Sequence, residues 1–301
     1  MATADGERDL VVLGIPIDSE ALVEGCNLAP RVLREAGLVA ALGADDAGDL
    51  SVAITDTRRD PVTGVLGYRQ MCDATQTIRE GLLPLLDGSR FVVAAGGCCS
   101  VLIGIFAALR DKFRRAGLAF LDGHLDFYSG TTTPTGCAAD FELWTLTGFG
   151  PPGLSDVGGP APMLAPRDTW LLGFRDHADS LEFNSPDPYE LIPQAHFVDY
   201  ETVLQRGASA VGGEAALALA FDPGRFWVHL DLDVLSSRAM PAVDYWEPGG
   251  FDWDQLRQLL TPLIASPACI GLDVTIYNPS LDPRRKHAAK IVELLRDVLA
   301  T

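Results

Sequence analysis

The stretch that decides the fold is residues 118–126, LAFLDGHLD, in which four apolar residues are followed directly by a segment with two aspartates and a histidine. A short apolar run without alternation is typical of a strand buried on both faces of a parallel sheet. Residues 91–100, FVVAAGGCCS, and 226–235, FWVHLDLDVL, show the same change from apolar to polar. Ligands of parallel α/β sheets bind beyond the carboxyl ends of the strands. We therefore expect the polar residues that follow these three runs to meet at one edge of the sheet.

Apolar runs and helical periodicity alternate along the rest of the chain. Further strands are expected at residues 9–15, 50–54, 169–173, 196–198 and 269–274. Helices are expected at residues 30–42, 71–86, 100–115, 141–147, 201–221, 252–264 and 284–299. This alternation predicts an α/β fold with a mostly parallel sheet that is covered on both faces. The Gly- and Pro-rich residues 148–166 are interpreted as a long loop near a site and not as a domain boundary.

Composition excludes several classes of protein. The 301 residues contain 23 Lys and Arg against 41 Asp and Glu, a formal net charge of −18, so a basic nucleic-acid footprint is absent. No apolar run reaches the ~18 residues of a membrane span, and residues 1–10 lack the pattern of a signal peptide. The six cysteines are scattered and contain no CxxC pair, which disfavours a disulfide framework. A cytoplasmic protein without a nucleic-acid or membrane partner is the expectation.

The acids at the strand ends are spaced for a metal site. Alternate residues of an extended chain share a face, so Asp122, His124 and Asp126 can converge, and so can Asp231 and Asp233. Four crowded carboxylates repel one another unless cations neutralise them. Oxygen-rich sets with a single imidazole suit Mn²⁺ or a similar ion, often as a pair. A lone DxD is most often a turn or a helix cap, but DxHxD and DxD together favour a metal centre.

These motifs, in this order, resemble those of the arginase/agmatinase/formiminoglutamase family, the ureohydrolases. The similarity covers most of the chain and includes the segments GIP at 14–16, GGCCS at 96–100, GFRD at 173–176, EPGG at 247–250 and NPSL at 278–281. The resemblance implies one three-layer α/β/α domain over residues 1–301, with a mostly parallel central sheet. It also implies two Mn²⁺ ions per chain, a small polar substrate and hydrolysis of a C–N bond in a linear amidine. Members of the family often form homo-oligomers, but the sequence does not indicate which surface would pair.

The resemblance implies roles for five of the site residues. Asp122 and Asp231 bridge the two ions, His124 and Asp233 hold one of them, and Asp126 holds the other. Asp126 is also the expected proton carrier, so Asp126 and His124 are the candidate catalytic residues. The chemistry fits general principles, because two cations lower the pKa of a bound water and a neighbouring carboxylate moves its proton.

The first departure from the family pattern is Cys99, which stands where the family has a histidine ligand. A thiolate can replace an imidazole as a ligand and admits another divalent metal, so Cys99 is a candidate sixth ligand. The alternative is a small buried residue at a helix start and the loss of one metal. A cysteine at this position is a feature of the Nω-hydroxy-L-arginine amidinohydrolase branch, which the chain resembles in other stretches too.

The substrate side departs further. The proton-shuttling histidine of the family falls on Ala139, and the glutamate that grips the guanidinium falls on Ile276. Three other candidates for substrate contact are Thr135, which matches a family hydroxyl, Tyr128 and Tyr245. A substitute charge could come from one of four acids that are otherwise typical of a solvated surface: Asp244, Glu142, Asp179 and Glu182.

Three residues near these motifs are interpreted as structural. His229 is expected to be a packed core residue, Arg175 to anchor a loop by ion pairing, and Glu247 to tie a turn.

Three functions stay open. The first is a binuclear-metal amidinohydrolase that acts on an Nω-hydroxyarginine-like substrate in a specialised biosynthetic pathway. The second is the same metal site acting on an amide, a hydroxamate or another non-guanidine compound. The third is a non-catalytic binding protein.

Overall fold

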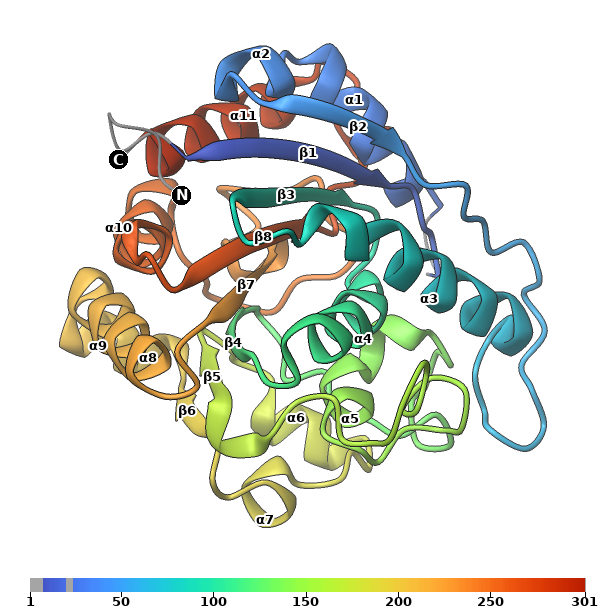
Figure 1. Ribbon diagram of the computed structural model, residues 1–301. Helices are drawn as coiled ribbons and strands as arrows, with labels where there is room; N and C mark the ends of the chain where they lie inside the picture. The colour runs from blue at the N-terminus through green and yellow to red at the C-terminus, as the bar shows by residue number, and fades with distance from the viewer. Residues whose placement is uncertain (1–7, 20–23, 301) are drawn as a thin grey trace.

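The computed structural model describes residues 8–19 and 24–300, and its centre is one parallel sheet of eight strands in the order β2-β1-β3-β8-β7-β4-β5-β6. Helices cover both faces, which confirms the predicted three-layer α/β/α fold (Figure 1). The strands are β1 (Asp9–Ile15), β2 (Asp45–Asp49), β3 (Arg90–Gly96), β4 (Gly117–Leu121), β5 (Thr169–Leu172), β6 (His196–Val198), β7 (Phe226–Asp231) and β8 (Cys269–Thr275). The first seven residues, which carry most of the segment judged for a signal peptide, lie outside the described part.

The helices lie in two layers. On one side α9, α10 and α11 pack in succession, and on the other α3, α4 and α5 do so (Figure 1). The α-helices are α1 (Ala29–Glu35), α2 (Leu38–Leu42), α3 (Tyr68–Leu82), α4 (Val101–Phe113), α5 (Glu142–Leu146), α6 (His177–Glu182), α7 (Pro188–Leu191), α8 (Tyr200–Arg206), α9 (Ala208–Phe221), α10 (Trp253–Ala265) and α11 (Lys286–Leu299). Among the described residues, no helix has both the length and the apolar character to cross a membrane.

The expected strand at residues 50–54 is wrong, and its place in the sheet is taken by β2. This edge strand reads DDAGD and is largely exposed, so no apolar run marks it. Its carboxylates are held by Arg34, whose guanidinium contacts Asp46 at 3.0 Å and also pairs with Asp49. An edge strand has solvent on one side and needs charge more than apolar residues.

Two expected helices are each divided by a glycine. Residues 30–42 form α1 and α2, which are separated at Gly37 (φ 93°), and residues 201–221 form α8 and α9, separated at Gly207 (φ 87°). This left-handed backbone ends a helix at little steric cost only for glycine. The short helices α6 and α7 were not expected from the sequence.

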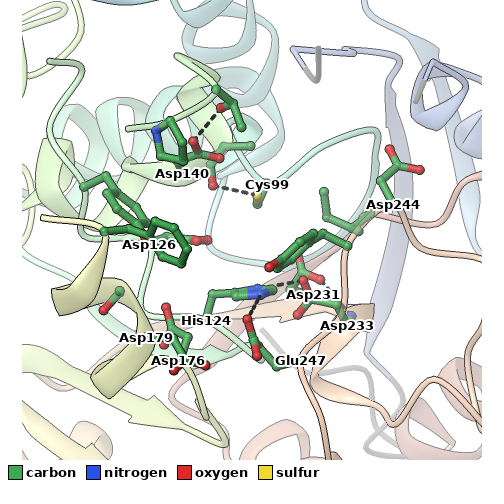
Figure 2. Close-up of a pocket in the computed structure, with 18 of the residues that line it drawn as sticks. Cys99, His124, Asp126, Asp140, Asp176, Asp179, Asp231, Asp233, Asp244 and Glu247 are labelled. Atoms are coloured by element: carbon green, nitrogen blue, oxygen red, sulfur yellow. Dashed lines mark hydrogen bonds and ion pairs between the residues drawn. The ribbon is translucent and has the colours of Figure 1, made fainter. Parts of the chain in front are cut away.

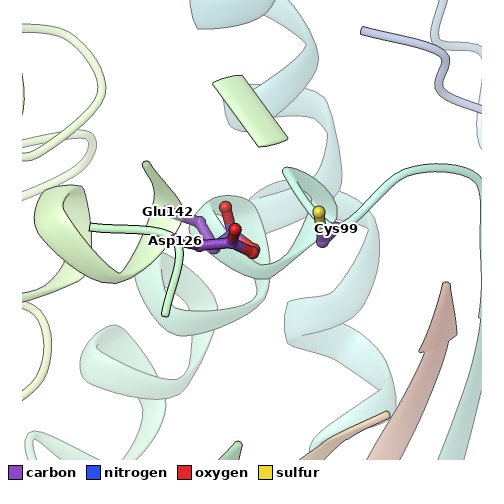
Figure 3. A group of neighbouring side chains, drawn as sticks. All are labelled: Cys99, Asp126 and Glu142. Carbon is purple, nitrogen blue, oxygen red and sulfur yellow. The ribbon is translucent and has the colours of Figure 1, made fainter. Parts of the chain in front are cut away.

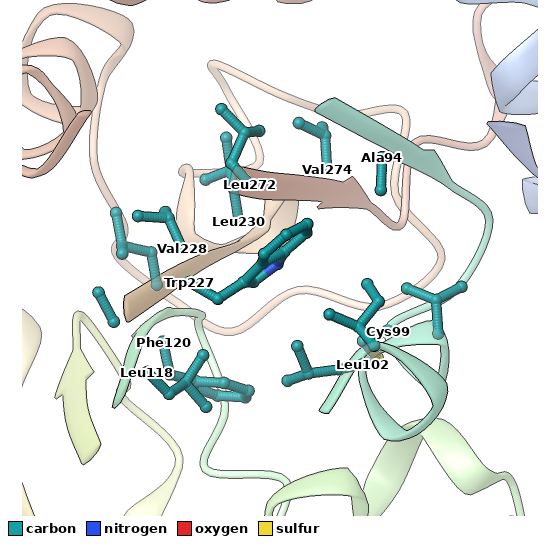
Figure 4. Close-up of a cluster of buried hydrophobic side chains, with 14 of the residues drawn as sticks. Ala94, Cys99, Leu102, Leu118, Phe120, Trp227, Val228, Leu230, Leu272 and Val274 are labelled. Atoms are coloured by element: carbon teal, nitrogen blue, oxygen red, sulfur yellow. The ribbon is translucent and has the colours of Figure 1, made fainter. Parts of the chain in front are cut away.

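The interior strands form the core. Leu118 and Phe120 of β4, Trp227 of β7 and Leu102 of α4 are all buried and pack between the sheet and the helical layer (Figure 4). Burial of a Leu or Phe side chain stabilises the fold by about 1.5–3 kcal/mol, which explains why these runs are apolar without alternation. The register aligns Ala95, Val274 and Leu230, so the central strands end level with one another.

The long loop over residues 148–166 exists but does not line the cavity described below. It packs instead on α3 and α4, where the Arg110 guanidinium donates to the carbonyl oxygens of Gly159 and Pro160, each at 3.2 Å. Its residues are not among those that line the cavity, although the Phe149 ring lies 6.3 Å, between centroids, from the ring of Phe127, which follows Asp126.

Candidate metal centre and active site

A cavity of about 760 Å³ opens at the carboxyl ends of the four central strands β3, β8, β7 and β4 (Figure 2). Its floor comes from the segments that directly follow these strands, as expected from the sequence. Two glycines make the close approach of these segments sterically feasible. A Cβ atom on Gly97 would lie 1.7 Å from the carbonyl oxygen of Ile17, and one on Gly123 would lie 2.7 Å from the Arg175 guanidinium.

The two acidic motifs are held by their own backbone. The amide of His124 donates to Asp122 Oδ1 at 2.7 Å, and the amide of Asp233 donates to Asp231 Oδ1 at 2.8 Å. The motifs are also joined, because the Gly123 amide donates to Asp233 Oδ1 at 2.9 Å. Each carboxylate therefore keeps an oxygen directed away from these turns, and the strands β4 and β7 fix its position.

His124 lies among carboxylates at the floor of the cavity (Figure 2). Its Nδ1 lies 2.9 Å from Asp233 Oδ2 and 3.6 Å from Asp122 Oδ1, and its Nε2 lies 3.9 Å from Glu247 Oε1. Burial opposes the imidazolium charge, but the Asp233 and Asp122 carboxylates outweigh it and raise the pKa of His124 well above its ordinary value. Asp122, His124 and Asp233 form one group whose ligand atoms lie within 4.8 Å of one another.

A second group contains Cys99, Asp126 and Glu142, again within 4.8 Å (Figure 3). Cys99 follows β3 and donates its thiol hydrogen to the carbonyl oxygen of Ala139 at 3.3 Å. Asp126 lies at the end of its motif with a left-handed backbone (φ 45°) that is uncommon for a residue other than glycine. Glu142 is fully buried at the start of α5, and neither of its carboxylate oxygens has a hydrogen-bond partner among the described residues.

Glu142 corrects one expectation, since it was considered as a surface acid. The sequence indicates this burial only through the position of Glu142, a lone carboxylate between the apolar residues Phe141 and Leu143. Burial raises the pKa of Glu142 to about 8, and burial together with the Glu142 charge raises the pKa of Asp126 well above its ordinary value. Burial and the same neighbours also raise the pKa of the Cys99 thiol.

A third group contains Asp122, His229 and Asp231. His229 is fully buried, as expected of a core residue, but its Nε2 atom has no hydrogen-bond partner among the described residues. Burial, followed by the Asp233 and Asp122 charges, raises the pKa of Asp231 well above its ordinary value. Asp122 belongs to this group and to the group of His124 and Asp233, which makes it a candidate bridging carboxylate, whereas the group of Cys99 shares no residue with either.

The donor set fits divalent cations. Buried polar atoms are normally paired, yet Asp122 Oδ2, His124 Nε2, His229 Nε2 and both Glu142 oxygens have no hydrogen-bond partner in the described part of the chain. Unpaired carboxylates at this depth are costly in the absence of a counter-charge. Bound cations reverse that cost and favour the ionised forms. Oxygen and imidazole donors in these numbers suit a pair of ions such as Mn²⁺.

All five residues considered for substrate contact line the cavity: Thr135, Tyr128, Tyr245, Asp244 and Ile276. Thr135 already donates to Asp140 Oδ2 at 2.5 Å. The ring of Tyr245 is half exposed and lies 5.5 Å from the His124 ring, between centroids. Ile276 is buried with φ 64°, a strained conformation for a β-branched side chain.

Asp244 lies at the opposite side of the cavity from Asp126 (Figure 2). Its Oδ1 accepts from the amide of Asn278 at 2.6 Å, and its Oδ2 accepts from the thiol of Cys26 at 3.3 Å. Asn278 follows Ile276 in the same loop, so this contact ties Asp244 to the segment where the family glutamate is missing. Burial raises the pKa of Asp244 above its ordinary value.

Several acids of the cavity wall were not identified as site residues from the sequence. The wall includes three such carboxylates: Asp140, Asp176 and Glu247. Asp179 was considered as a substitute charge and does line the cavity, whereas Glu182, considered with it, is exposed and does not. Glu247 was expected to tie a turn, but it faces His124. Among the described residues that line the cavity there is no Lys or Arg.

Arg175 anchors the site differently from the expectation of an ion pair. Its guanidinium donates to the carbonyl oxygens of Asp233 at 2.9 Å, Val234 at 3.2 Å and Gly173 at 3.3 Å. The planar guanidinium holds its donors in a rigid fork, so it can bind several carbonyl groups in a fixed arrangement that the compact ammonium of lysine cannot reproduce. Arg175 thereby fixes the turn that carries Asp233.

Comparison with known proteins agrees with this geometry. The model of the family described as "Arginase family" matches residues 8–300. An arginase of Bacillus caldovelox is 24% identical over 294 residues, covering 96% of this chain and 97% of that protein. The solved structure of Bacillus caldovelox arginase superposes with a TM-score of 0.88 at 22% identity, covering 98% of this chain and 99% of that chain. Proclavaminate amidino hydrolase from Streptomyces clavuligerus superposes with a TM-score of 0.70 at 18% identity, covering 97% and 90%. The chain belongs to the arginase family, whose members are metal-dependent hydrolases of C–N bonds in amidines.

Proposed function

We propose that this protein is a binuclear-metal amidinohydrolase that acts as a single domain over residues 1–301 and cleaves a C–N bond of a guanidino or amidino compound. The observation that carries the proposal is the cavity at the strand ends. Its floor groups carboxylates with imidazoles, its wall adds further carboxylates, and its described lining contains no Lys or Arg. Such a cavity favours both bound cations and a cationic substrate.

Six residues are proposed to hold two Mn²⁺ ions: Cys99, Asp122, His124, Asp126, Asp231 and Asp233. Support comes from the spacing of their donor atoms within groups of 4.8 Å and from two of these atoms, Asp122 Oδ2 and His124 Nε2, which have no hydrogen-bond partner among the described residues. When bound, two such cations act as Lewis acids that lower the pKa of water and stabilise developing negative charge on the substrate.

Asp126 is the proposed proton carrier. Its carboxyl lines the cavity beside the other proposed ligands, and a carboxylate in that place can accept a proton from a bound water and release it again. Glu142 lies behind it and is the nearest acid of the same group. His124 is proposed to hold its position through Asp233 and Glu247, which keep the imidazole directed into the cavity.

The substrate is proposed to be a cation that spans the cavity. Asp244 replaces the charge that is missing at Ile276, because its contact with Asn278 ties it to the loop that carries Ile276. Thr135 and the rings of Tyr128 and Tyr245 supply further wall contacts. An Nω-hydroxyarginine-like compound in a specialised biosynthetic pathway fits this description best.

A second candidate keeps the metals and changes the substrate. Ile276 and Ala139 are both buried in the cavity wall, and neither can bind a guanidinium group through a charge. This favours an amide, a hydroxamate or another non-guanidine compound as the alternative substrate. The non-catalytic binding protein is the remaining alternative.

A panel of substrates tests these functions. Mn²⁺-loaded protein is incubated with guanidines, N-hydroxyguanidines, amides and hydroxamates, and the products are identified by mass spectrometry. Release of urea or hydroxyurea is the expected result, with its loss in Asp126→Asn. Turnover of amides or hydroxamates alone supports the second candidate. Inertness to every compound, by protein that has bound its metal, contradicts catalysis and supports the binding protein.

A further inference from the structure

His229 is placed to do more than fill the core. It lies on β7 two residues before Asp231, so the two side chains point to the same face of the sheet. Its ring stacks on Phe120 of the neighbouring strand β4, with centroids 4.8 Å apart and planes at 24°. This contact fixes the plane of a fully buried imidazole directly beneath the carboxylates of the cavity floor.

Asp273 of β8 determines that the Nδ1 atom of this imidazole carries a hydrogen. Its Oδ2 lies 2.6 Å from His229 Nδ1, and its Oδ1 accepts from the indole nitrogen of Trp227, also at 2.6 Å. A carboxylate offers only acceptors, so Nδ1 carries a hydrogen and Nε2 is the nitrogen that is left for a metal ion. A histidine that binds a metal ion through one nitrogen commonly donates from the other to a carboxylate in this way.

The Nε2 atom of His229 faces the acids. Nε2 lies 3.8 Å from Asp122 Oδ2, and neither atom has a hydrogen-bond partner among the described residues. The distance is too long for a hydrogen bond. Two ligands that each lie ~2.1 Å from one ion are separated by about 3–4 Å, so this gap matches an ion bound between them. Asp231 completes a group within 4.8 Å.

We propose that His229 is a metal ligand, which binds one of the two ions through Nε2 together with Asp122 and Asp231. This imidazole comes from β7 and replaces the one that is missing at Cys99. The group that contains Cys99 shares no residue with this one, so the second ion has an imidazole ligand without needing a thiolate. The inference rests on the proposed function, because it requires the metal centre proposed there.

The unmutated protein provides the first test. Protein labelled with ¹⁵N-histidine is freed of metal and titrated with Zn²⁺, which is diamagnetic, and its five histidines are followed in long-range ¹H–¹⁵N spectra. Nε2 of His229 is expected to shift at stoichiometric metal, while Nδ1 keeps its hydrogen. If Zn²⁺ binds and shifts His124 but leaves His229 unchanged, the inference is wrong and the metal centre stands. If no Zn²⁺ binds at all, the proposed function fails with it.

Variants provide the second test, with metal content after Mn²⁺ loading and the metal dissociation constants as readouts. In His229→Gln the second ion is expected to bind more than about 100-fold more weakly and the first nearly normally. In Asp273→Asn an amide N–H faces Nδ1 and moves the hydrogen to Nε2, so the second ion weakens ~10–100-fold. His196→Gln is the matched control, because His196 is exposed on β6 of the same sheet.

The following outcomes decide whether His229 is a metal ligand or only a packed core residue. Two ions bound with unchanged affinity in folded His229→Gln overturn the inference. If His229→Gln does not fold, which circular dichroism shows, Asp273→Asn and the wild-type spectra decide. An unshifted His229 in the wild type or normal affinity in folded Asp273→Asn then overturns the inference.

Discussion

Glu142→Gln gives a quantitative test of whether the centre is built for cations. Burial raises the pKa of Glu142 from 4.5 to about 8, a difference of about 3.5 pH units. At ~1.4 kcal/mol per pH unit, ionising this group in the metal-free fold costs up to about 5 kcal/mol. This is an upper limit, because Asp126 in the same group also resists ionisation.

The sign follows from the direction of the shift. Since the folded protein holds this proton more tightly than the unfolded chain, the stabilisation is complete below pH 4.5 and is lost as the pH rises toward 8. Glutamine keeps the shape and cannot ionise. Metal-free Glu142→Gln is therefore expected to be more stable than metal-free wild type at pH 8.5, by several kcal/mol, and nearly equal to it at pH 5.

Urea unfolding in the presence of EDTA, at pH 5 and at pH 8.5, measures this difference. Glu182→Gln is the control, because it removes an exposed carboxylate of α6 and should change stability little at either pH. Mn²⁺ is expected to abolish the advantage of glutamine at pH 8.5, since a cation stabilises the ionised acid. Equal stability of wild type and Glu142→Gln at both pH values, in folded metal-free protein, would refute the reasoning.

Three further predictions concern the cavity and its supports. In Ile276→Glu a charge-assisted contact worth about 1.5–3 kcal/mol should lower KM for a guanidine ~10-fold or more, and an unchanged KM would contradict a cationic substrate bound near this wall. With Co²⁺ bound, a thiolate charge-transfer absorption that disappears in Cys99→Ser and persists in Cys98→Ser is expected; its absence from wild type would show that Cys99 is not a ligand. Arg175→Lys loses part of the support for the turn of Asp233 and should weaken metal binding ~10-fold by calorimetry, whereas normal affinity would make that support irrelevant.

The sequence predicts the interior of the fold well because each central strand is recognisable from its own residues. An apolar run that ends in a polar residue marks β3, β4 and β7 without any knowledge of their neighbours. The edge strand β2 contains no apolar run. Its acidic residues are compatible with a strand because Arg34, from another element, pairs with them. Local patterns predict local structure, and β2 depends on a partner from another element.

The same distinction applies to the site. Asp122, His124 and Asp126 share one short motif directly after a strand, so their place at this edge of the sheet follows from the sequence. The left-handed backbone of Asp126, which directs it to the group of Cys99 and Glu142, does not follow from the motif. The surroundings of His229 depend on Asp273, which lies 44 residues away in the sequence. The sequence alone does not distinguish a histidine that packs in the core from one that binds a metal ion, because the distinction depends on that partner. Glu142 is similar, because only burial beside Asp126 distinguishes it from a surface acid.

Metal content tests the central claim most directly. The protein is loaded with Mn²⁺, freed of excess ion by gel filtration, and its metal is measured against its concentration by mass spectrometry. Two Mn²⁺ ions per chain are predicted, with a spin-coupled electron paramagnetic resonance signal that indicates neighbouring ions. Less than half an equivalent of any transition metal after loading would contradict a binuclear centre at these strand ends.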